Sequence, residues 1–548
     1  MPLQRVIVLL SALLLSACAQ NTNTRVEPVP LKISSLTQAE HAAFTNGQGQ
    51  LQLHWPEQRS ARQALNNRRR FLAYAGQGEL LIDMQQAHEI VLKVNQQTLR
   101  VSRSADGQPF KLDLAAFTTN GDNYLQLVDI KPVEARVSLS LPFPTLREDL
   151  TRYSAAFAKV DELILTEVAQ GFPGAVLLVA KDGIIIKHSA YGYAKRYDQH
   201  GQPLLSPVAM QPDTLFDLAS NSKMYATNYA LMHLVSTGKL NINLPIQHYL
   251  PEFQGAGREQ IKVRDLLYNT AGAPAALPFF RPDQRYGKAF FAQSKSAVEQ
   301  RIVTQVPFAP AKVPQAVYSD IHFMLLGMLV ERLVGQPLDT YVEQQFYQVL
   351  GLQQTMFNPL AKGMAKSQLA ATELAGNSRA GRITFPSIRQ EVVWGEVHDE
   401  NAFYAFQGVA GHAGLFSSAA DLAKLMAVAL QGGGYGWQQF FQQSTLQQFT
   451  RPSLYNPSYG LGWRLAVGGE LAWHFGAYAS DYAYGHTGWT GTATVIDPAK
   501  QLIVVLLTNK KHSPILADSQ GDDFMGDRFE TGRYGSILTL IYAALAAL

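Results

Sequence analysis

The chain has 548 residues, of which 47% are hydrophobic, and its formal net charge at pH 7 is only +3. A chain of this length exceeds what one compact core usually organises, so we expect two or three domains with ample apolar side chains to fill them. Acidic and basic residues are nearly balanced and no basic run occurs, which argues against a nucleic-acid-binding protein.

Residues 1–17 have the layout of a secretion signal. The apolar run from Val6 to Leu15 is too short for a membrane-spanning helix, which needs about 20 apolar residues. The Leu-Ser-Ala-Cys ending at Cys18, the single cysteine of the chain, resembles the lipobox of bacterial lipoproteins. We therefore predict a lipoprotein signal peptide and lipid attachment at Cys18. Ala19 is not the aspartate that retains enteric-type lipoproteins in the inner membrane, which favours the outer membrane.

Two segments are expected before the main domain. Residues 18–49 would form the lipidated N-terminus and a tether, because their first part is polar and carries prolines. Residues 50–145 contain short strand-like runs separated by turn signals, such as Asn-Gly-Asp at 120–122. These runs predict a β-sandwich-like module, to which the sequence assigns no function.

The remaining chain, residues 147–548, has β-rich ends around a helix-rich middle. Its expected elements are a helix over 147–168, strands over 175–181, 184–188, 493–496 and 502–507, and a closing helix over 536–548. This order predicts an α/β (α+β) domain in which both ends form one antiparallel sheet flanked by helices and the middle forms a helical subdomain.

A Ser-x-x-Lys pattern marks the candidate nucleophile. Ser220 and Lys223 stand at the start of a helix-compatible run, and residues three apart in a helix share a face. A serine hydroxyl needs a base, and a desolvated lysine can lose its charge and serve as one. The same pattern recurs at Ser236 and Lys239, but Gly238 ends the helix there. We therefore predict Ser220 as the nucleophile.

Two later segments supply companions for this pair. Tyr318 stands at a loop-to-helix junction, where its hydroxyl can relay protons, although a buried structural tyrosine fits the same position. His486, Thr487 and Gly488 lead into an apolar strand. Gly488 would let a substrate backbone lie along the strand edge, Thr487 offers a hydroxyl for a carboxylate, and His486 offers a donor or a partial positive charge.

The three ordered motifs resemble those of class C β-lactamases, penicillin-binding DD-peptidases and related esterases, namely Ser-x-x-Lys, Tyr-x-Asn and Lys- or His-Thr-Gly. The resemblance covers about residues 147–548 and is closest to the penicillin-binding protein 4B group of D-alanyl-D-alanine carboxypeptidases. The stretches that carry it are residues 218–228, 394–400, 411–416 and 484–491. It implies a β-lactamase/transpeptidase-like fold.

The resemblance also implies a division of roles. Ser220 would attack a carbonyl carbon while Lys223 and Tyr318 share the proton work. The backbone N–H groups of Ser220 and Trp489 would form the oxyanion hole, where each donor lowers the reaction barrier by roughly 3 to 4 kcal/mol. An acyl-enzyme would result, with no metal and no organic cofactor.

Two positions depart from the family pattern. Asp320 stands at a predicted substrate-binding position where the family usually has asparagine, so the donor amide that would recognise a substrate amide becomes an acceptor-only carboxylate. If Asp320 pairs with Lys223, it would hold the lysine charged and make Tyr318 the better candidate for the base. His486 replaces the lysine typical of efficient class C β-lactamases, which favours a peptidase.

Four residues in the middle of the chain could be read as metal ligands. His398, Asp399 and Glu400 are adjacent in sequence, and His412 follows closely. Their spacing matches no standard metal site, so we expect a structural or substrate-loop role for them.

Together these features predict a periplasm-facing membrane lipoprotein, on the outer membrane, that acts on peptidoglycan-type peptides or β-lactams. The leading prediction is a D-alanyl-D-alanine carboxypeptidase that works through an acyl-enzyme. A β-lactamase or a carboxylesterase would use the same chemistry. A non-catalytic cell-wall-binding lipoprotein is the alternative from another functional class, since such a protein could use an inherited hydrolase fold for binding.

Overall fold

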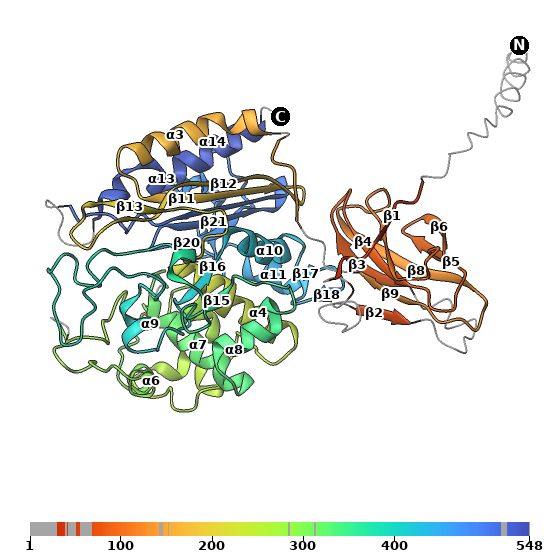
Figure 1. Ribbon diagram of the computed structural model, residues 1–548. Coiled ribbons are helices and arrows are strands. Elements are labelled where there is room, and N and C mark those ends of the chain that lie inside the picture. The colour runs from red at the N-terminus through yellow and green to blue at the C-terminus, as the bar shows by residue number, and fades with distance from the viewer. Residues whose placement is uncertain are drawn as a thin grey trace, which may run out of the picture.

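The computed structural model describes residues 30–38, 41, 51–54 (backbone only), 68–141, 146–151, 153–282, 285–311, 314–516 and 523–546. The predicted signal peptide and Cys18 lie outside these residues. Figure 1 shows a β-rich module, in red and orange, beside a larger mixed domain. Among the described residues, no helix is both long and apolar enough to cross a membrane.

The N-terminal module consists of two antiparallel sheets that pack face to face. In spatial order the first contains β1 (Ile33–Ser35), β7 (Phe110–Asp113), β4 (Glu79–Asp83), β9 (Ser138–Leu141) and β2 (Leu51–His54). The second contains β3 (Arg69–Ala73), β8 (Gly121–Lys131), β5 (Glu89–Val94) and β6 (Gln97–Ser102). Alternate side chains of both sheets, such as Leu80 and Ile90, fill one buried cluster.

The module begins earlier than the sequence suggested. Strand β1 lies within residues 18–49, the segment predicted to be a tether, and it pairs with β7 of the sandwich. Three residues are too few to show an alternating pattern, so a strand this short carries no signal of its own.

The larger domain is built on one eight-stranded sheet drawn from both of its ends. Its main path is β10 (Arg147–Glu148), β12 (Ile184–Tyr197), β11 (Gly174–Lys181), β22 (Leu502–Thr508), β21 (Thr492–Asp497), β20 (Tyr484–Gly488) and β19 (Arg464–Leu465), and β13 (Pro203–Ala209) pairs with β12. All pairs are antiparallel except β10 with β12. The predicted joining of the two ends into one sheet is therefore confirmed.

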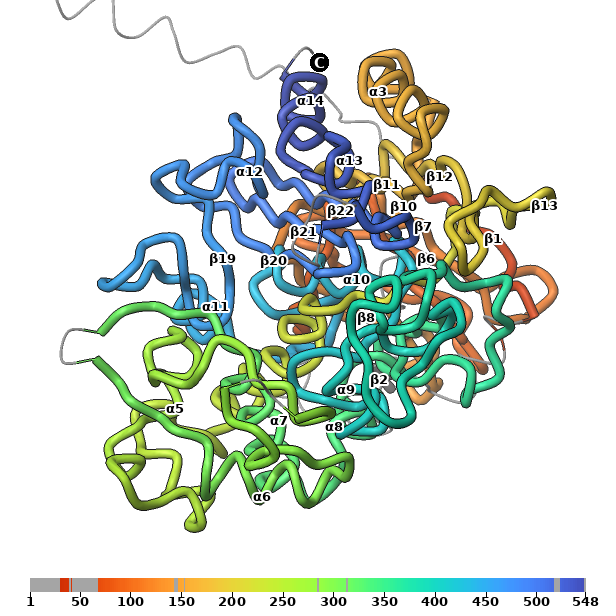
Figure 2. The backbone as a smooth tube through the Cα atoms, turned by 90° about the vertical axis from the view of Figure 1, so that its left-hand side faces the viewer, coloured from red at the N-terminus to blue at the C-terminus, as the bar shows by residue number. Residues whose placement is uncertain are grey.

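Helices cover both faces of this sheet. Helices α3 (Ala158–Ala169) and α14 (Gly535–Ala546) lie together on one face, where Leu177 and Val179 of β11 pack against them (Figures 1 and 2). The intervening residues of β11, Val176 and Leu178, join the core on the opposite face with α10 (Ala419–Leu430). The predicted helix over 147–168 was wrong in its first part, because residues 147–148 form β10.

The middle of the domain forms a helical subdomain below the sheet (Figure 1). The other helices described in the domain are α4 (Tyr229–Ser236), α5 (Val263–Leu267), α6 (Lys295–Thr304), α7 (Asp320–Val334), α8 (Leu338–Val342), α9 (Glu400–Tyr404), α11 (Gln443–Phe449), α12 (Ala472–Phe475) and α13 (Glu530–Arg533). Two small sheets complete it, with the orders β14 (Phe216–Asp217), β16 (Leu415–Ser417), β15 (Met356–Phe357) and β17 (Gly434–Tyr435), β18 (Gln438–Gln439).

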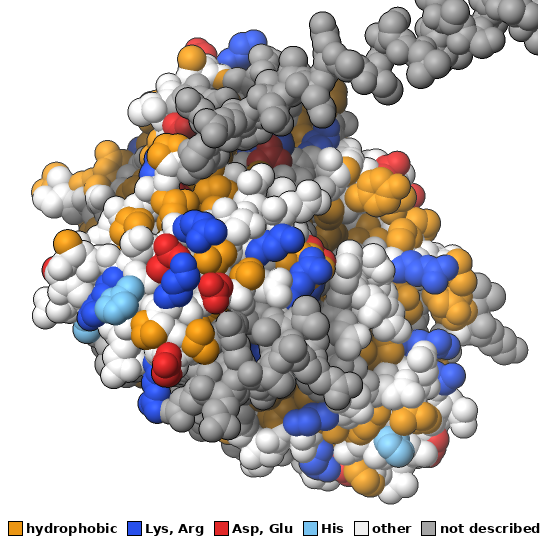
Figure 3. Space-filling model, turned by 90° about the vertical axis from the view of Figure 1, so that its right-hand side faces the viewer, with side chains coloured by type: hydrophobic (Ala, Val, Ile, Leu, Met, Phe, Trp, Pro, Cys, Tyr) orange, Lys and Arg blue, Asp and Glu red, His pale blue; other side chains and the backbone are white. Residues whose placement is uncertain are grey.

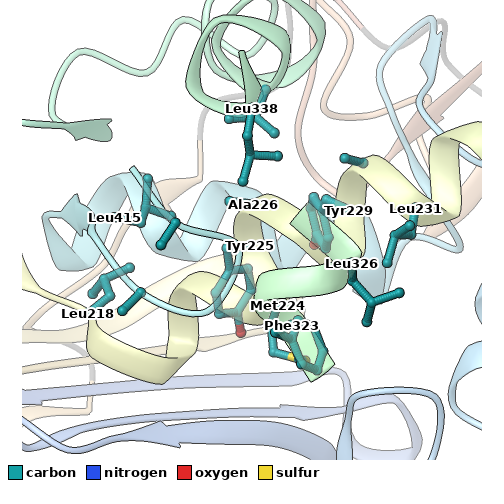
Figure 4. Close-up of a cluster of buried hydrophobic side chains, with 14 of the residues drawn as sticks. Leu218, Met224, Tyr225, Ala226, Tyr229, Leu231, Phe323, Leu326, Leu338 and Leu415 are labelled. Atoms are coloured by element: carbon teal, nitrogen blue, oxygen red, sulfur yellow. The ribbon is translucent and has the colours of Figure 1, made fainter. Parts of the chain in front are cut away.

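Buried apolar side chains surround the helix that begins with the Ser-x-x-Lys segment. A 3-10 turn at Ala219–Asn221 is followed by a π-helical turn at Lys223–Asn228 and then by α4. Figure 4 shows Met224 and Tyr225 packed with Phe323 and other apolar side chains from α7, α8 and β16. Such close packing fixes the helix that carries the candidate nucleophile. Irregular helical turns of this kind often mark functional sites.

Candidate active site

Ser220 stands on a sharp, strained turn between β14 and the buried helix. Ala219, directly before it, has a φ of +46°, a left-handed conformation that non-glycine residues rarely adopt. The side chain of Asp217 accepts a hydrogen bond from the Ala219 N–H at 2.9 Å. Thr492 of β21 donates its hydroxyl to the Leu218 carbonyl at 3.0 Å. These contacts hold the turn and present Ser220 at the edge of the sheet.

Two predicted partners reach the Ser220 hydroxyl. Lys223 Nζ donates to Ser220 Oγ at 2.9 Å from the next helical turn. Tyr318 Oη donates to the same oxygen at 2.9 Å from the loop that precedes α7. The structure thus brings together three residues that are separated by up to 98 positions in sequence.

Lys223 is completely buried and has polar contacts with three groups. Beside Ser220 Oγ, its Nζ contacts the His412 carbonyl at 2.9 Å and the Asp320 carboxylate at 2.7 Å. Burial acts to lower the pKa of Lys223, but the charge of Asp320 and the contact with Tyr318 outweigh it, so the pKa lies above its usual value. The lysine is therefore an ammonium ion in the free site.

Tyr318 is protonated as well. Burial raises the pKa of Tyr318, and the opposing effect of Lys223 is smaller. The Ser220 oxygen therefore accepts hydrogen bonds from two protonated groups in the free site. One of these groups must release a proton before it can take the Ser220 proton, and Asp320 is the carboxylate closest to Lys223.

Strand β20 forms a wall of the site beside the serine turn. A Cβ added to Gly488 would lie 2.4 Å from the Leu218 carbonyl oxygen, so only glycine permits this close approach. Gly488 therefore places the Trp489 backbone next to the turn that carries Ser220. This arrangement is the one that an oxyanion hole between the N–H groups of Ser220 and Trp489 requires.

His486 lies in this wall as a neutral side chain. Burial lowers the pKa of His486 well below its usual value, and the positive charges of Arg464 and Lys223 act in the same direction. Its Nδ1 lies 2.8 Å from the Thr487 carbonyl oxygen, and its ring lies 6.1 Å from the ring of Tyr318. His486 can therefore offer a hydrogen bond but not a charge.

The positive charge beside Thr487 comes from Arg464, which the sequence analysis missed. Arg464 on β19 donates from Nη1 to Thr487 Oγ1 at 2.6 Å. Its Nε is buried and has no hydrogen-bond partner among the described residues. The Arg464 side chain is partly exposed, so its guanidinium adds a positive charge at the end of the strand that carries Thr487. A lone arginine 22 positions before His486 gave no sequence signal.

The histidines considered as metal ligands lie in two separate pairs. His398 Nε2 lies 2.9 Å from Glu373, and His412 Nε2 lies 2.9 Å from Asp399. Among the residues that the structure describes, no group of three or more His, Cys, Asp or Glu side chains could hold a metal ion. The loop that contains His412 instead supplies the backbone carbonyl that binds Lys223 Nζ.

The second Ser-x-x-Lys pattern has a structural role. Ser236 is the last residue of α4, and its hydroxyl donates to Thr445 Oγ1 at 2.8 Å. It also accepts a hydrogen bond from the backbone N–H of Gln442 at 2.9 Å. These bonds tie the end of α4 to the segment that begins α11.

Comparisons with known proteins identify the family of the chain. Residues 155–521 match the family model described as Beta-lactamase. The chain is 48% identical over 395 residues to a Bacillus subtilis (strain 168) protein named "N-acetylmuramyl-L-alanine amidase", covering 71% of this chain and 88% of that one. It is 44% identical over 400 residues to an Escherichia coli (strain K12) protein named "Putative D-alanyl-D-alanine carboxypeptidase", covering 71% and 90%.

A solved structure shows the same fold. A penicillin-binding protein homologue from Caulobacter crescentus superposes with a TM-score of 0.50 at 21% identity, covering 71% of this chain and 97% of that one. The family resemblance and the mixed α/β fold expected from the sequence are thereby confirmed.

Proposed function

Because the chain belongs to the beta-lactamase family of hydrolases, we propose that it is a serine hydrolase that acts on amide bonds of peptidoglycan through an acyl-enzyme at Ser220. The observation that carries this proposal is the position of Ser220 Oγ, 2.9 Å from both Lys223 Nζ and Tyr318 Oη. A hydroxyl held by two proton-transfer groups beside a glycine-permitted strand edge is arranged for acyl transfer.

The proposed reaction has two steps, acylation of Ser220 and hydrolysis of the acyl-enzyme. Ser220 Oγ attacks the carbonyl carbon, and its proton passes to the Tyr318 oxygen as Tyr318 gives up its own phenol proton, while Lys223 stays charged and stabilises the negative charge that develops on the phenol oxygen. The backbone N–H groups of Ser220 and Trp489 stabilise the negative carbonyl oxygen. Tyr318 donates a proton to the leaving amine. Water then attacks the ester carbon and passes one proton through Tyr318 to Ser220 Oγ, so the Ser220 hydroxyl is restored and the acyl group leaves as a carboxylic acid.

We propose D-alanyl-D-alanine carboxypeptidase as the specific reaction. Its substrate ends in a free carboxylate, and Arg464 with Thr487 offers a cation and a hydroxyl for such a group. The name of the Escherichia coli relative supports the same reaction. The missing lysine at position 486 speaks against an efficient β-lactamase.

An amidase is the second candidate, and the Bacillus subtilis relative favours it. In that reaction the acyl group on Ser220 would be the muramyl carboxyl, and the leaving group would be the amine of L-alanine. The chemistry at Ser220 is unchanged, so the two candidates differ only in which bond lies at the nucleophile.

Penicillin labelling tests the acyl-enzyme. We expect the full-length protein to form a covalent adduct with a fluorescent penicillin, the Ser220→Ala variant to form none, and the matched Ser236→Ala variant to label normally. An adduct that persists in Ser220→Ala, or no adduct in the unchanged protein, would overturn the proposal.

Product analysis separates the two reactions. Incubation with a disaccharide-pentapeptide should release D-alanine and leave the sugar attached to a tetrapeptide, which mass spectrometry detects. Free pentapeptide and free disaccharide would instead assign the amidase reaction. Turnover of a chromogenic cephalosporin or a short nitrophenyl ester without release of either product would point to a β-lactamase or a carboxylesterase.

We also propose that the protein is a lipoprotein of the outer membrane facing the periplasm. The signal-like residues 1–17 and the position of Cys18 as the single cysteine support this proposal. Cells grown with a labelled fatty acid should incorporate the label into the wild-type chain, which should fractionate with outer membranes. The Cys18→Ser variant should incorporate none, and equal labelling of both would refute lipidation at this position.

A further inference from the structure

The N-terminal module is held against the catalytic domain by specific contacts. Leu72 of β3 donates its N–H to the Gly436 carbonyl in the β17–β18 hairpin at 2.8 Å. Gln77 donates its side-chain amide to the Gly183 carbonyl at 2.6 Å. The Tyr74 ring packs over Gly183 so closely that an added Cβ would lie 2.1 Å from it. These contacts fix how the two parts face each other (Figure 1).

A large open cleft lies along this junction. Its volume is about 1150 Å3, and residues of both parts line it. The module contributes Asn120 and Asp122, while the catalytic domain contributes Gln443 and Gln447 of α11 and the exposed Tyr482. Pockets for small ligands enclose about 300–1000 Å3. A cleft of this size and openness therefore fits a segment of a longer molecule.

The lining favours an uncharged ligand rich in hydroxyl and amide groups. Side-chain amides such as Gln443 and Gln447 both donate and accept hydrogen bonds. Among the described residues that line the cleft, the cation is Arg70, and it pairs with Asp122 at 2.6 Å. The face of the module that points away from the catalytic domain, seen in Figure 3, carries both Lys or Arg and Asp or Glu side chains. Asp481 also lines the cleft, so the described lining residues offer a polyanion no excess of positive charge.

An aromatic ring completes this chemistry. Tyr482 lines the cleft with 75% of its surface exposed. An exposed tyrosine offers a flat apolar face with a polar edge, which suits a sugar ring that has one apolar face and a rim of hydroxyls. Amides and an aromatic ring in one open cleft are the groups that an N-acetylated sugar chain needs.

The cleft and the catalytic serine are joined by one strand. Tyr484 at the start of β20 lines the cleft, and Thr487 and Gly488 of the same strand form the wall beside Ser220. Three residues of a strand span about 10 Å. An extended peptide of four or five residues reaches about 13–18 Å. A stem peptide attached to a sugar in the cleft is therefore long enough to cover the distance of about 10 Å from Tyr484 to Thr487 along β20.

We propose that this cleft binds the glycan strand of peptidoglycan as a neutral chain of N-acetylated hexosamines, while a peptide attached to that strand enters the site at Ser220. This inference rests on the proposed function, which supplies the substrate. It gives the N-terminal module a role, namely to form one side of the glycan site.

Binding of a simple neutral probe tests the cleft apart from catalysis. We expect the full-length Ser220→Ala protein to bind an N-acetylglucosamine hexasaccharide in calorimetry. In that background, Tyr482→Ala and Gln447→Ala should each weaken binding by about tenfold, the loss expected for one hydrogen bond or ring contact. Tyr478 and Gln448 are exposed residues of the same two types outside the cleft lining. Their alanine variants should bind within twofold of the parent.

Each outcome decides between the cleft and the proposed function. Penicillin labelling without measurable saccharide binding would overturn this inference and leave the serine hydrolase standing. Saccharide binding without penicillin labelling would support the cleft as a saccharide site and overturn the serine hydrolase. Equal losses in the cleft and control variants would place the saccharide elsewhere. Tyr482→Ala should also raise KM for polymeric peptidoglycan but not for a free pentapeptide, and an unchanged KM for the polymer would refute the proposed path from cleft to Ser220.

Discussion

The Asp320→Asn variant probes what sets the charge of Lys223. The carboxylate lies 2.7 Å from Nζ, and the lysine side chain is fully buried. At this distance Coulomb's law gives about 1.5 kcal/mol with the dielectric constant of water and about 6 kcal/mol with an effective value of 20. The attraction therefore falls in the range between these two values, and because it favours the charged lysine, Asp320 raises the pKa of Lys223. Because 34% of the Asp320 side chain is exposed, water screens the pair and favours the lower half of this range.

The variant should therefore bring the titration of Lys223 into an observable range. In the unchanged protein the pKa of Lys223 lies above its usual value of 10.5, so the lysine keeps its proton between about pH 6 and 9. His486 stays neutral over the same range because its pKa is lowered well below 6.5. Neither Lys223 nor His486 therefore adds a step to the pH dependence of the acylation rate in this range. In Asp320→Asn, burial acts on a lysine without its counter-charge and lowers the pKa.

The assay is the second-order rate of acylation by a penicillin as a function of pH. We expect a profile without a lysine step for the unchanged protein and a new step for Asp320→Asn. A rate that rises through the step shows that neutral Lys223 takes the Ser220 proton. A rate that falls shows that the ammonium form is needed and that Tyr318 is the base. Asp213→Asn, which removes an exposed carboxylate, is the control and should match the unchanged protein.

Superimposable profiles for the unchanged protein and Asp320→Asn would refute this reasoning. They would mean that Asp320 does not determine the protonation of Lys223 despite the 2.7 Å separation.

Four further substitutions test individual contacts. Tyr318→Phe keeps the ring but removes the donor to the nucleophile, so stopped-flow acylation should slow by about 10²- to 10⁴-fold. Gly488→Ala sets a Cβ 2.4 Å from a backbone carbonyl, and acylation should be lost while the circular dichroism spectrum is kept. Arg464→Ala should raise KM about tenfold to hundredfold for a substrate with a free carboxylate but not for an uncharged ester. Ser236→Ala should lower the free energy of unfolding by about 1 kcal/mol in urea titration and leave acylation unchanged.

The opposite results would each identify a wrong assignment. Full activity of Tyr318→Phe would remove the phenol from the proton path, and full activity of Gly488→Ala would show that the strand edge can move. Equal effects of Arg464→Ala on charged and uncharged substrates would make the arginine structural. Slower acylation in Ser236→Ala would link the second Ser-x-x-Lys pattern to catalysis.

Local patterns predicted much of the sheet. The hairpin at 175–188 and the strands near 493–507 follow from alternating or continuous apolar runs around turn residues, and the structure has them as β11, β12, β21 and β22. The short strands β1 and β10 were not predicted, because two or three residues are too few to show an alternating pattern. Their pairing partners, β7 and β12, lie far along the chain.

The site was predictable in its motifs and not in its supports. Ser220, Lys223 and Tyr318 could be selected because their types and order fit a known chemistry. Asp217 could not, since it holds the serine turn through backbone N–H groups, one of them at His398, 181 positions away. The role of Arg464 could not be predicted from the sequence either, because only the folded sheet places its side chain beside Thr487.

The position of Asp320 explains why a carboxylate fits where the family usually has an amide. Asp320 is the first residue of α7, directly after the capping residue Ser319, whose side chain accepts a hydrogen bond from the Ile321 N–H at 3.3 Å. The first turn of a helix stabilises a negative side chain, since unpaired N–H groups and the helix dipole point toward it. Asp320 thus interacts favourably with both the helix end and Lys223. The replacement of asparagine by Asp320 is therefore compatible with the fold. Its effect is on the charge of Lys223, which a Ser-x-x-Lys motif alone does not reveal.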